Sequence, residues 1–283
     1  MLNTEIIDEA VTRALHEDAP EGDITSNHLI PADATAVAEL VAREPGVFSG
    51  GEVFAAAFKL TDPSTAVELK IKDGEPFVAG QLLAVVTGNA RAVLTAERIG
   101  LNFSQRMCGI ATLTAQYVAA IAGTKAKILD TRKTTPGLRP FERHAVVCGG
   151  GHNHRYSLSD QVLAKDNHLA VLTRGGKDLT TELKRVRSEI EPAIKFEVEV
   201  DRIDQIAPVL AANVDIIMLD NFTLDELRAG VAMIDGKATV EASGGVNLQT
   251  VADIAATGVD VISVGALTHS ARALDLGLDV KID

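Results

Sequence analysis

The sequence contains little cysteine. Its 283 residues include only Cys108 and Cys148, and their spacing matches no disulfide framework. A chain of this length can build its core without disulfides, so we expect a reducing, cytoplasmic setting. No apolar run reaches the roughly 18 residues that a membrane span needs. The acidic, amphipathic start MLNTEIIDEAVTRALHED lacks the basic, apolar and small-residue zones of a signal peptide.

Positive residues are outnumbered: the chain has 27 Lys and Arg against 39 Asp and Glu, which gives a formal net charge of -12. This balance argues against nucleic acid or an anionic membrane as a partner. The chain has no Walker loop and no dinucleotide-binding fingerprint, since CGGG at 148–151 lacks the required spacing.

One region reverses this charge. Residues 125–165 hold eight Lys or Arg against three acidic residues, and four of the seven histidines fall between 144 and 168. A solvated basic face is the ordinary explanation of such a cluster. Here the cations alternate with glycine, threonine and apolar residues, which favours an anion-binding site.

The pattern of expected helices and strands differs between the two parts of the chain. The first 110 or so residues indicate a mixed unit with a helix near residues 6–15, capped by Asn3 or Thr4. Three strands are expected in it, at 36–43, 66–72 and 81–88. A helix over 91–107 and a second one over 111–121, after Gly109, follow.

After residue 125, short β-rich runs alternate with helical segments. Such alternation indicates βαβ units around a parallel sheet, and six units suit a small α/β barrel. The six runs are 126–130, 161–165, 195–200, 215–220, 238–243 and 259–265.

Polar residues and glycines gather where these runs end. In barrel enzymes the active site lies at the carboxyl ends of the strands, so this pattern predicts an enzyme. The residues, in chain order, are Thr131, Arg132, Lys133, Lys165, Asp166, Glu199, Asp220, Ser243, Gly244, Gly245 and Gly265.

The run KFEVEV alternates, which places Glu197 and Glu199 on the face opposite its apolar residues. Glutamates inside a barrel require cations or a metal as partners. For Glu197 an internal ion pair, for example with Lys165, remains open. Glu199 and Asp220 end neighbouring strands, so we expect them to hold Mg²⁺ beside a substrate phosphate.

Two loops between a strand and a helix contain glycine, ASGGV (242–246) and SVGALTHS (263–270). Exposed backbone N–H groups and a helix dipole favour phosphate there, although each loop alone could be a simple tight turn. The stretch HAVVCGGGHNHR suggests zinc through His144, Cys148, His152 and His154, but the spacing fits no standard ligand set. We instead expect His154 and Arg155 to face an anion.

These motifs, in order, resemble the quinolinate phosphoribosyltransferase family of type II phosphoribosyltransferases. The series is TRKTTPGLR, GGGHNHRYSLSD, KDNH, EVEV, LDNF, ASGGV and VGALTHS, and the resemblance extends back through EDAPEGDIT, REPGVFSG and TAERIGLNFSQRMCGIAT. It implies phosphoribosyl transfer from 5-phosphoribosyl-1-pyrophosphate to quinolinate, with Mg²⁺ and loss of CO₂, in NAD biosynthesis. His144 stands where we expect lysine in many relatives, outside the core motifs.

The resemblance also implies a fold and an assembly. The fold is α/β, with an N-terminal α/β sandwich over residues 1–110 and an open barrel of about six parallel strands over 111–271. The tail 272–283 is expected to pack back onto the first domain. The implied assembly is a homodimer in which Arg98 reaches the partner's active site.

The resemblance assigns roles to individual residues. We expect no residue to act as a covalent nucleophile. The implied quinolinate-binding residues are Arg98, Thr131, Arg132, His154, Arg155 and Lys165. The implied binders of phosphoribosyl pyrophosphate are Lys133, Lys165, Glu199, Asp220, Ser243, Gly244, Gly245, Gly265 and His269, with Glu199 and Asp220 also the metal ligands.

Three other functions stay open on the sequence. A relative with the same fold could act on nicotinate, because fold does not determine substrate. Lys165 could form a Schiff base in an aldolase. A phosphometabolite sensor would bind without turnover. Arg98, Arg132, His154 and Arg155 together favour the dicarboxylate over nicotinate, and the surrounding cations with the two acids argue against an aldolase.

Overall fold

A computed structural model describes residues 2–283. In it the chain folds into two compact units. The first comprises residues 2–115, Thr134–Gly150 and Ser270–Asp283, and the second comprises Gln116–Lys133 and Gly151–His269. The predicted boundary after residue 110 lies inside one long helix, α4 (Ala90–Ala120). None of the helices in residues 2–283 combines the length and apolarity needed to span a bilayer.

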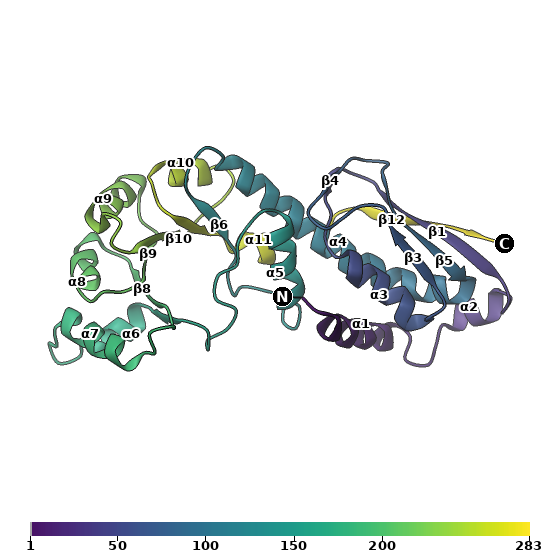
Figure 1. Ribbon diagram of the computed structural model, residues 1–283, viewed down its shortest axis with the longest axis horizontal. Coiled ribbons are helices and arrows are strands. Elements are labelled where there is room, and N and C mark those ends of the chain that lie inside the picture. The colour runs from purple at the N-terminus through teal and green to yellow at the C-terminus, as the bar shows by residue number, and fades with distance from the viewer. Residues whose placement is uncertain (1) are drawn as a thin grey trace. The chain divides into compact units, whose positions relative to one another are not determined.

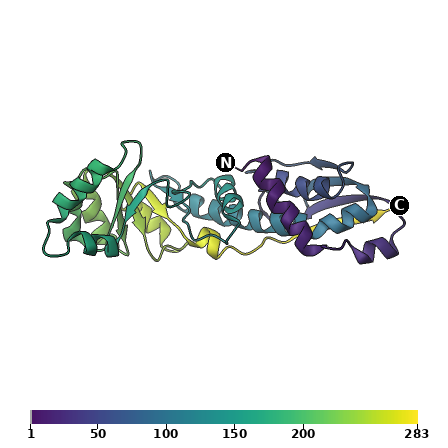
Figure 2. The same ribbon diagram turned by 90° about the horizontal axis from the view of Figure 1, so that it is seen from below.

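The first unit has an antiparallel sheet with the strand order β12-β1-β5-β3. Helices α3 and α4 lie on one side of this sheet, and α1 lies outermost, packed on α3 (Figures 1 and 2). The elements are α1 (Thr4–Asp18), α2 (Ile24–Leu29), β1 (Thr35–Ala42), β2 (Gly46–Val47), α3 (Gly51–Thr61), β3 (Ala66–Leu69), β4 (Pro76–Phe77), β5 (Leu82–Asn89), α5 (Arg139–Cys148) and β12 (Leu276–Ile282).

Local chemistry explains several of these elements. Asn3 caps α1 because its side chain accepts a hydrogen bond from the Ile6 N–H. Strand β1 alternates buried and exposed residues, so its buried face packs against the helices. The tail residues form β12, which pairs antiparallel with β1 from Ala36 opposite Ile282 to Ala42 opposite Leu276.

The prediction of two helices around Gly109 was wrong, because α4 runs through this position without a break. A Cβ atom added to Gly109 would lie 2.0 Å from the Arg272 carbonyl oxygen. Gly109 therefore permits a close approach of the C-terminal segment to the helix and does not end the helix.

The segment Thr134–Gly150 packs with the first unit through α5. The rings of Phe141 on α5 and Phe103 on α4 have centroids 5.2 Å apart. The buried Glu142 forms an ion pair with Arg106, with 2.7 Å between Oε1 and Nη2. A buried carboxylate needs such a partner, so this pair ties α5 to α4.

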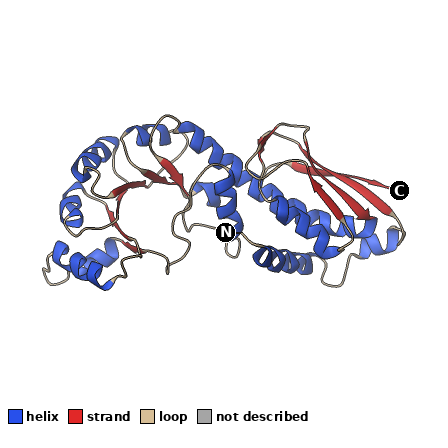
Figure 3. Cartoon of the chain, viewed as in Figure 1, coloured by secondary structure: helices blue, strands red, loops and turns tan. Residues whose placement is uncertain are grey.

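The second unit is an open α/β barrel, as predicted. Its six strands are all parallel, in the order β6-β11-β10-β9-β8-β7, and helices lie outside the curved sheet (Figure 3). The elements are β6 (Lys127–Leu129), β7 (Val162–Ala164), α6 (Asp166–Leu172), α7 (Leu179–Glu189), β8 (Phe196–Val200), η1 (Ile203–Gln205), α8 (Ile206–Leu210), β9 (Ile216–Asp220), α9 (Leu224–Ile234), β10 (Thr239–Ser243), α10 (Val251–Ala256), β11 (Val261–Ser263) and α11 (Ala266–His269).

The two edge strands, β6 and β7, are not paired with each other in the described sheet. Beside β6, His152 forms a parallel bridge with Leu129, and its N–H donates to the Ile128 carbonyl oxygen. The glycine-rich segment after α5 thus runs along β6 and brings His154 and Arg155 to the carboxyl ends of the strands.

Candidate active site

A cavity of about 630 Å³ lies at the carboxyl ends of the barrel strands. Four fixed cations and two carboxylates line it, together with the glycine loop after β10. The lining residues are Thr131, Arg132, Lys133, His154, Arg155, Leu163, Lys165, Glu199, Met218, Asp220, Asn221, Ser243, Gly244, Gly245 and Ser263.

Most of the predicted site residues therefore meet in one place. Gly265 and His269 do not line the cavity, but they adjoin it through Lys133. A Cβ atom added to Gly265 would lie 3.0 Å from Lys133 Cδ and 3.1 Å from His269 Nε2. Arg98 is exposed on α4 in the first unit.

Strand register explains the placement of the acids. Glu199 on β8 pairs with Met218 on β9, which pairs with Glu241 on β10. Asp220 lies two residues further along β9 and pairs with Ser243. The two predicted metal ligands thus project from neighbouring strands at successive levels, and both face the cavity.

Lys165 pairs with Glu199, with 2.6 Å between Nζ and Oε2. The suggested ion pair between Lys165 and Glu197 is therefore not present. Glu197 is fully buried and lies one level deeper on β8, where its Oε2 is 3.3 Å from His154 Nε2. Glu197 and Glu199 are two residues apart, so their side chains point to the same face of β8. They lie at different depths in the barrel, however, and each therefore contacts different side chains.

Arg132 and Arg155 both line the cavity, and they lie close enough for their charges to interact. Burial and the neighbouring charge of Arg132 both lower the pKa of Arg155. Arg155 also donates from Nη1 to the Gln161 carbonyl oxygen at 2.8 Å, which holds its guanidinium in place. Two planar guanidinium groups close together suit a ligand with two carboxylates.

His154 does not present both ring nitrogens to the cavity. Its Nε2 lies between Glu197 and Glu241, 3.3 and 3.5 Å from their Oε2 atoms. The backbone N–H of His154 donates to the buried Asp130 at 2.7 Å. These contacts make His154 a connection between the barrel interior and the cavity wall, a role that the sequence did not indicate.

Glu241 and Asn221 were also missed. Glu241 is fully buried and accepts a hydrogen bond from Ser263 Oγ. The signal was present, because alternation along β10 places Glu241 on the same face as Ser243. Asn221 has a left-handed backbone, with φ of 58°, and its N–H donates to the Ser243 carbonyl oxygen at 2.9 Å.

The four residues considered for zinc separate in the structure. His154 belongs to the trio with Glu197 and Glu241 in the second unit. His144 and Cys148 belong to the first unit, where Asp73 completes a different trio. A hydrogen bond to Asp73 is the main reason why the pKa of His144 rises to about 10.

The buried cluster of His154, Glu197 and Glu241 leads us to expect that stability depends on pH. Burial lowers the pKa of His154, but Glu197 and Glu241 outweigh it and raise it to about 10. A folded-state pKa above the ordinary 6.5 stabilises the fold fully below pH 6.5, and this part is lost as pH rises towards 10. We expect the free energy of unfolding to fall by roughly 1–3 kcal/mol over that interval because of His154.

Urea unfolding at several pH values would measure this, with His154→Gln as the comparison. The variant should lose that part of the slope, while His144 contributes equally to both proteins. The Arg155 N–H lies 2.7 Å from His154 Nδ1 and would favour a neutral ring. Equal slopes in both proteins would mean that this contact, and not the two glutamates, decides the charge.

A second prediction concerns the stability of the loop after β10, which contains Gly244 and Gly245. Gly244 has φ of 93°, and a Cβ atom there would lie 2.1 Å from Asn221 Oδ1. Gly244→Ala should therefore lower the free energy of unfolding by roughly 2–4 kcal/mol. Gly245→Ala is the matched control, because Gly245 has φ of 61° and no atom within 4 Å of the added Cβ.

Urea titration of both variants would check this difference. The control should lose only about 1 kcal/mol, the cost of a left-handed alanine. Equal losses would show that the contact with Asn221 does not constrain the loop.

Comparison with known proteins points to one family. Residues 23–108 match the N-terminal domain of quinolinate phosphoribosyl transferase, and residues 110–279 match its C-terminal domain. The chain is 43% identical to the carboxylating nicotinate-nucleotide pyrophosphorylase of Mycobacterium leprae, over 96% of each chain. It is 38% identical to the probable enzyme of that name from Bacillus subtilis, over 94% of this chain and 90% of the relative.

Comparison with solved structures agrees with this family assignment. The chain is similar to the crystal structure of NadC from Streptococcus pyogenes, with a TM-score of 0.95 and 36% identity. The similarity covers 100% of this chain and 99% of that one.

Proposed function

Because this chain belongs to the quinolinate phosphoribosyl transferase family, we propose that it transfers phosphoribose from 5-phosphoribosyl-1-pyrophosphate to quinolinate. The products are nicotinate mononucleotide, pyrophosphate and CO₂. The observation that carries this proposal is the cavity of the barrel. It combines two neighbouring arginines, two strand-end carboxylates and a glycine loop.

Quinolinate fits the part of the cavity lined by Arg132 and Arg155. Its two carboxylates lie on adjacent ring carbons, so two guanidinium groups can each bind one of them. Binding there would hold the pyridine nitrogen towards the ribose. Positioning of this kind turns a reaction between two molecules into one within a single complex.

The phosphoribosyl donor fits the remaining groups. Ser243, Gly244 and Gly245 would hold the 5-phosphate through backbone N–H groups, because anions bind at such glycine loops. Lys133 and Lys165 would contact the donor as point charges. Gly265 and His269 lie against Lys133, so they support this end of the site.

Mg²⁺ fits the donor set of the cavity. Glu199 and Asp220 offer carboxylate oxygens from neighbouring strands, the ligand type that Mg²⁺ prefers. When bound, the ion would neutralise charge on the departing pyrophosphate. Glu199 would then be shared with Lys165, its partner at 2.6 Å.

The chemistry requires no covalent nucleophile. The C1–O bond to pyrophosphate breaks, and the pyridine nitrogen forms a bond to C1. The ring then carries a positive nitrogen, which stabilises the electron pair left when the adjacent carboxylate departs as CO₂. A proton takes its place on the ring. Most of the work of the protein is therefore positioning and charge stabilisation.

A product assay tests the proposal. The purified protein would be incubated with phosphoribosyl pyrophosphate, Mg²⁺ and either quinolinate or nicotinate. We expect nicotinate mononucleotide and an equal amount of CO₂ from quinolinate alone. Product from nicotinate without CO₂ would contradict the assignment of the arginines. Turnover of neither acid, with trapping of a carbonyl substrate on Lys165 by borohydride, would favour an aldolase.

We also propose a cytoplasmic homodimer in which Arg98 completes the partner's active site. Arg98 is exposed on α4 of the first unit, so it is available to another chain. Both cysteines are free thiols, which agrees with a reducing setting.

Subunit mixing would test this arrangement. We expect Arg98→Ala and Lys165→Ala each to be inactive alone. After the two are unfolded together and refolded, roughly a quarter of the sites should be active, since each mixed dimer has one intact site. If Arg98 served its own chain, every site in the mixture would lack one group and no activity would return.

A further inference from the structure

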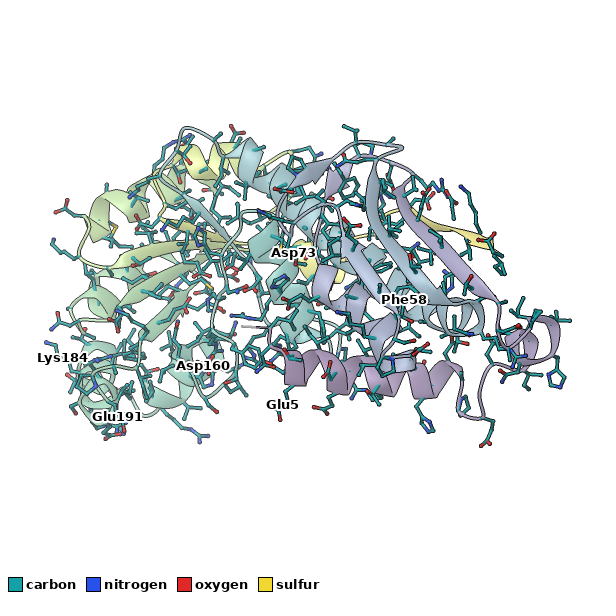
Figure 4. All side chains as sticks on the ribbon, turned by 45° about the vertical axis from the view of Figure 1, so that its right-hand side comes forward. Glu5, Phe58, Asp73, Asp160, Lys184 and Glu191 are labelled. Atoms are coloured by element: carbon teal, nitrogen blue, oxygen red, sulfur yellow. The ribbon has the colours of Figure 1, made fainter. Side chains whose placement is uncertain are left out.

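The first unit contains a second cluster of potential ligands, which the proposed function does not use. Asp73, His144 and Cys148 each offer one ligand atom, and all three atoms lie within 4.8 Å of one another. Asp73 lies in the turn between β3 and β4 (Figure 4), and the other two lie on α5. None of them lines the cavity of the second unit.

Helix geometry places the two α5 residues together. His144 and Cys148 are four residues apart, so both side chains project from the same face of α5. The same spacing serves zinc-binding histidine pairs in other proteins. From this face, His144 Nε2 is 2.6 Å and Cys148 Sγ is 3.9 Å from Asp73 Oδ2.

The carboxylate is held in a defined orientation by α3. Its Oδ1 accepts hydrogen bonds from the N–H groups of Gly50 and Gly51, at 3.1 and 3.0 Å. The Gly50 N–H also donates to Oδ2 at 3.0 Å, and this same oxygen faces His144 and Cys148. Carboxylates that bind metals are characteristically fixed by such secondary hydrogen bonds.

We propose that Asp73, His144 and Cys148 bind one divalent transition-metal ion of the zinc class. Tetrahedral zinc places sulfur, nitrogen and oxygen ligands about 3.5 Å apart, given bonds of 2.0–2.3 Å. The distances from Asp73 Oδ2, 2.6 Å to His144 Nε2 and 3.9 Å to Cys148 Sγ, lie within about 1 Å of that value. Thiolate and imidazole select such a metal over Mg²⁺, which prefers oxygen.

The site would have three protein ligands and one open position. A cavity of about 500 Å³ adjoins it, and both Asp73 and His144 line this cavity. Side chains of Asp73 and His144 are 28% and 32% exposed, so an ion can reach them from solvent. Water or a small anionic ligand would occupy the fourth position.

Cobalt binding gives the first test. The full chain would be stripped of metal with a chelator and titrated with Co²⁺, whose bond to a thiolate produces a charge-transfer band in the near ultraviolet. We expect the band to saturate at one ion per chain and to disappear when Zn²⁺ is added. The absence of this band in the unaltered protein would overturn the proposal.

Variants identify the ligands. Cys148→Ser should abolish the band, and Asp73→Asn or His144→Gln should weaken binding at least about tenfold. Cys108→Ala is the matched control, because Cys108 is the other thiol and is fully buried. The band should persist in it, and also in the double variant Glu199→Gln with Asp220→Asn. A band that survives Cys148→Ser would contradict the assignment.

Alkylation of the unaltered chain avoids any effect of a variant on folding. Zn²⁺ should slow the reaction of Cys148 with iodoacetamide at least about tenfold, since a metal-bound thiolate is a weaker nucleophile and is shielded. An unchanged rate at saturating Zn²⁺ would overturn the proposal, whether or not the product assay succeeds.

Discussion

Replacing Arg132 with alanine should raise the KM for quinolinate by roughly 100-fold or more, because removing one partner of a desolvated charge pair typically costs 2–5 kcal/mol. Arg132 and Arg155 both line the cavity, and the second arginine cannot hold both carboxylates. Steady-state kinetics with each substrate varied in turn would measure the effect. The KM for phosphoribosyl pyrophosphate should change much less.

Two further variants sharpen this result. Arg132→Lys keeps the charge but loses the planar fork, so it should recover only part of the affinity. Arg228→Ala is the control, because Arg228 lies on the outer helix α9 with its side chain 54% exposed. Its kinetics should match those of the unaltered protein. Normal affinity for quinolinate in Arg132→Ala would remove the basis for the dicarboxylate assignment.

Removing both strand-end carboxylates should have the largest effect on turnover. We expect Glu199→Gln combined with Asp220→Asn to lower kcat on the order of 1,000-fold, since stabilisation of the leaving charge is usually the main electrostatic contribution. The remaining activity should no longer depend on Mg²⁺ concentration. Kinetics across a range of Mg²⁺ concentrations would measure both quantities.

The matched control is Asp225→Asn, because Asp225 is an acid at the start of α9 with its side chain 95% exposed. It should retain full activity and the usual Mg²⁺ dependence. Each single variant should lie between the control and the double variant. An unchanged Mg²⁺ dependence in the double variant would mean that the metal is held elsewhere.

The sequence predicted the barrel well because its evidence is local. Each strand is a short apolar run followed by a polar residue or a glycine, and parallel strands place all such ends at one edge. The predicted strand at 195–200 begins only one residue earlier than the observed β8. The same reasoning supplied these residues of the cavity: Thr131, Arg132, Lys133, Lys165, Glu199, Asp220, Ser243, Gly244 and Gly245.

Partners across the interior could not be predicted in this way. His154 meets Glu197 and Glu241, which are far away in the sequence, and alternation gives the face of a strand but not the opposing atom. The trio around Asp73 has the same origin, since Asp73 and His144 are 71 residues apart. Only the packing of α5 within the first unit brings them together.

The sequence by itself therefore determined the parallel barrel, the edge of the sheet at which the candidate active site lies, and most residues of that edge. It could do so because strand periodicity and the residues at strand ends can be recognised within short segments of the chain. The tertiary structure decided that Glu199 pairs with Lys165, that His154 is anchored between two glutamates, and that Gly109 lies within a continuous helix. Each of these depends on contacts between distant segments, whose geometry exists only after the chain has packed.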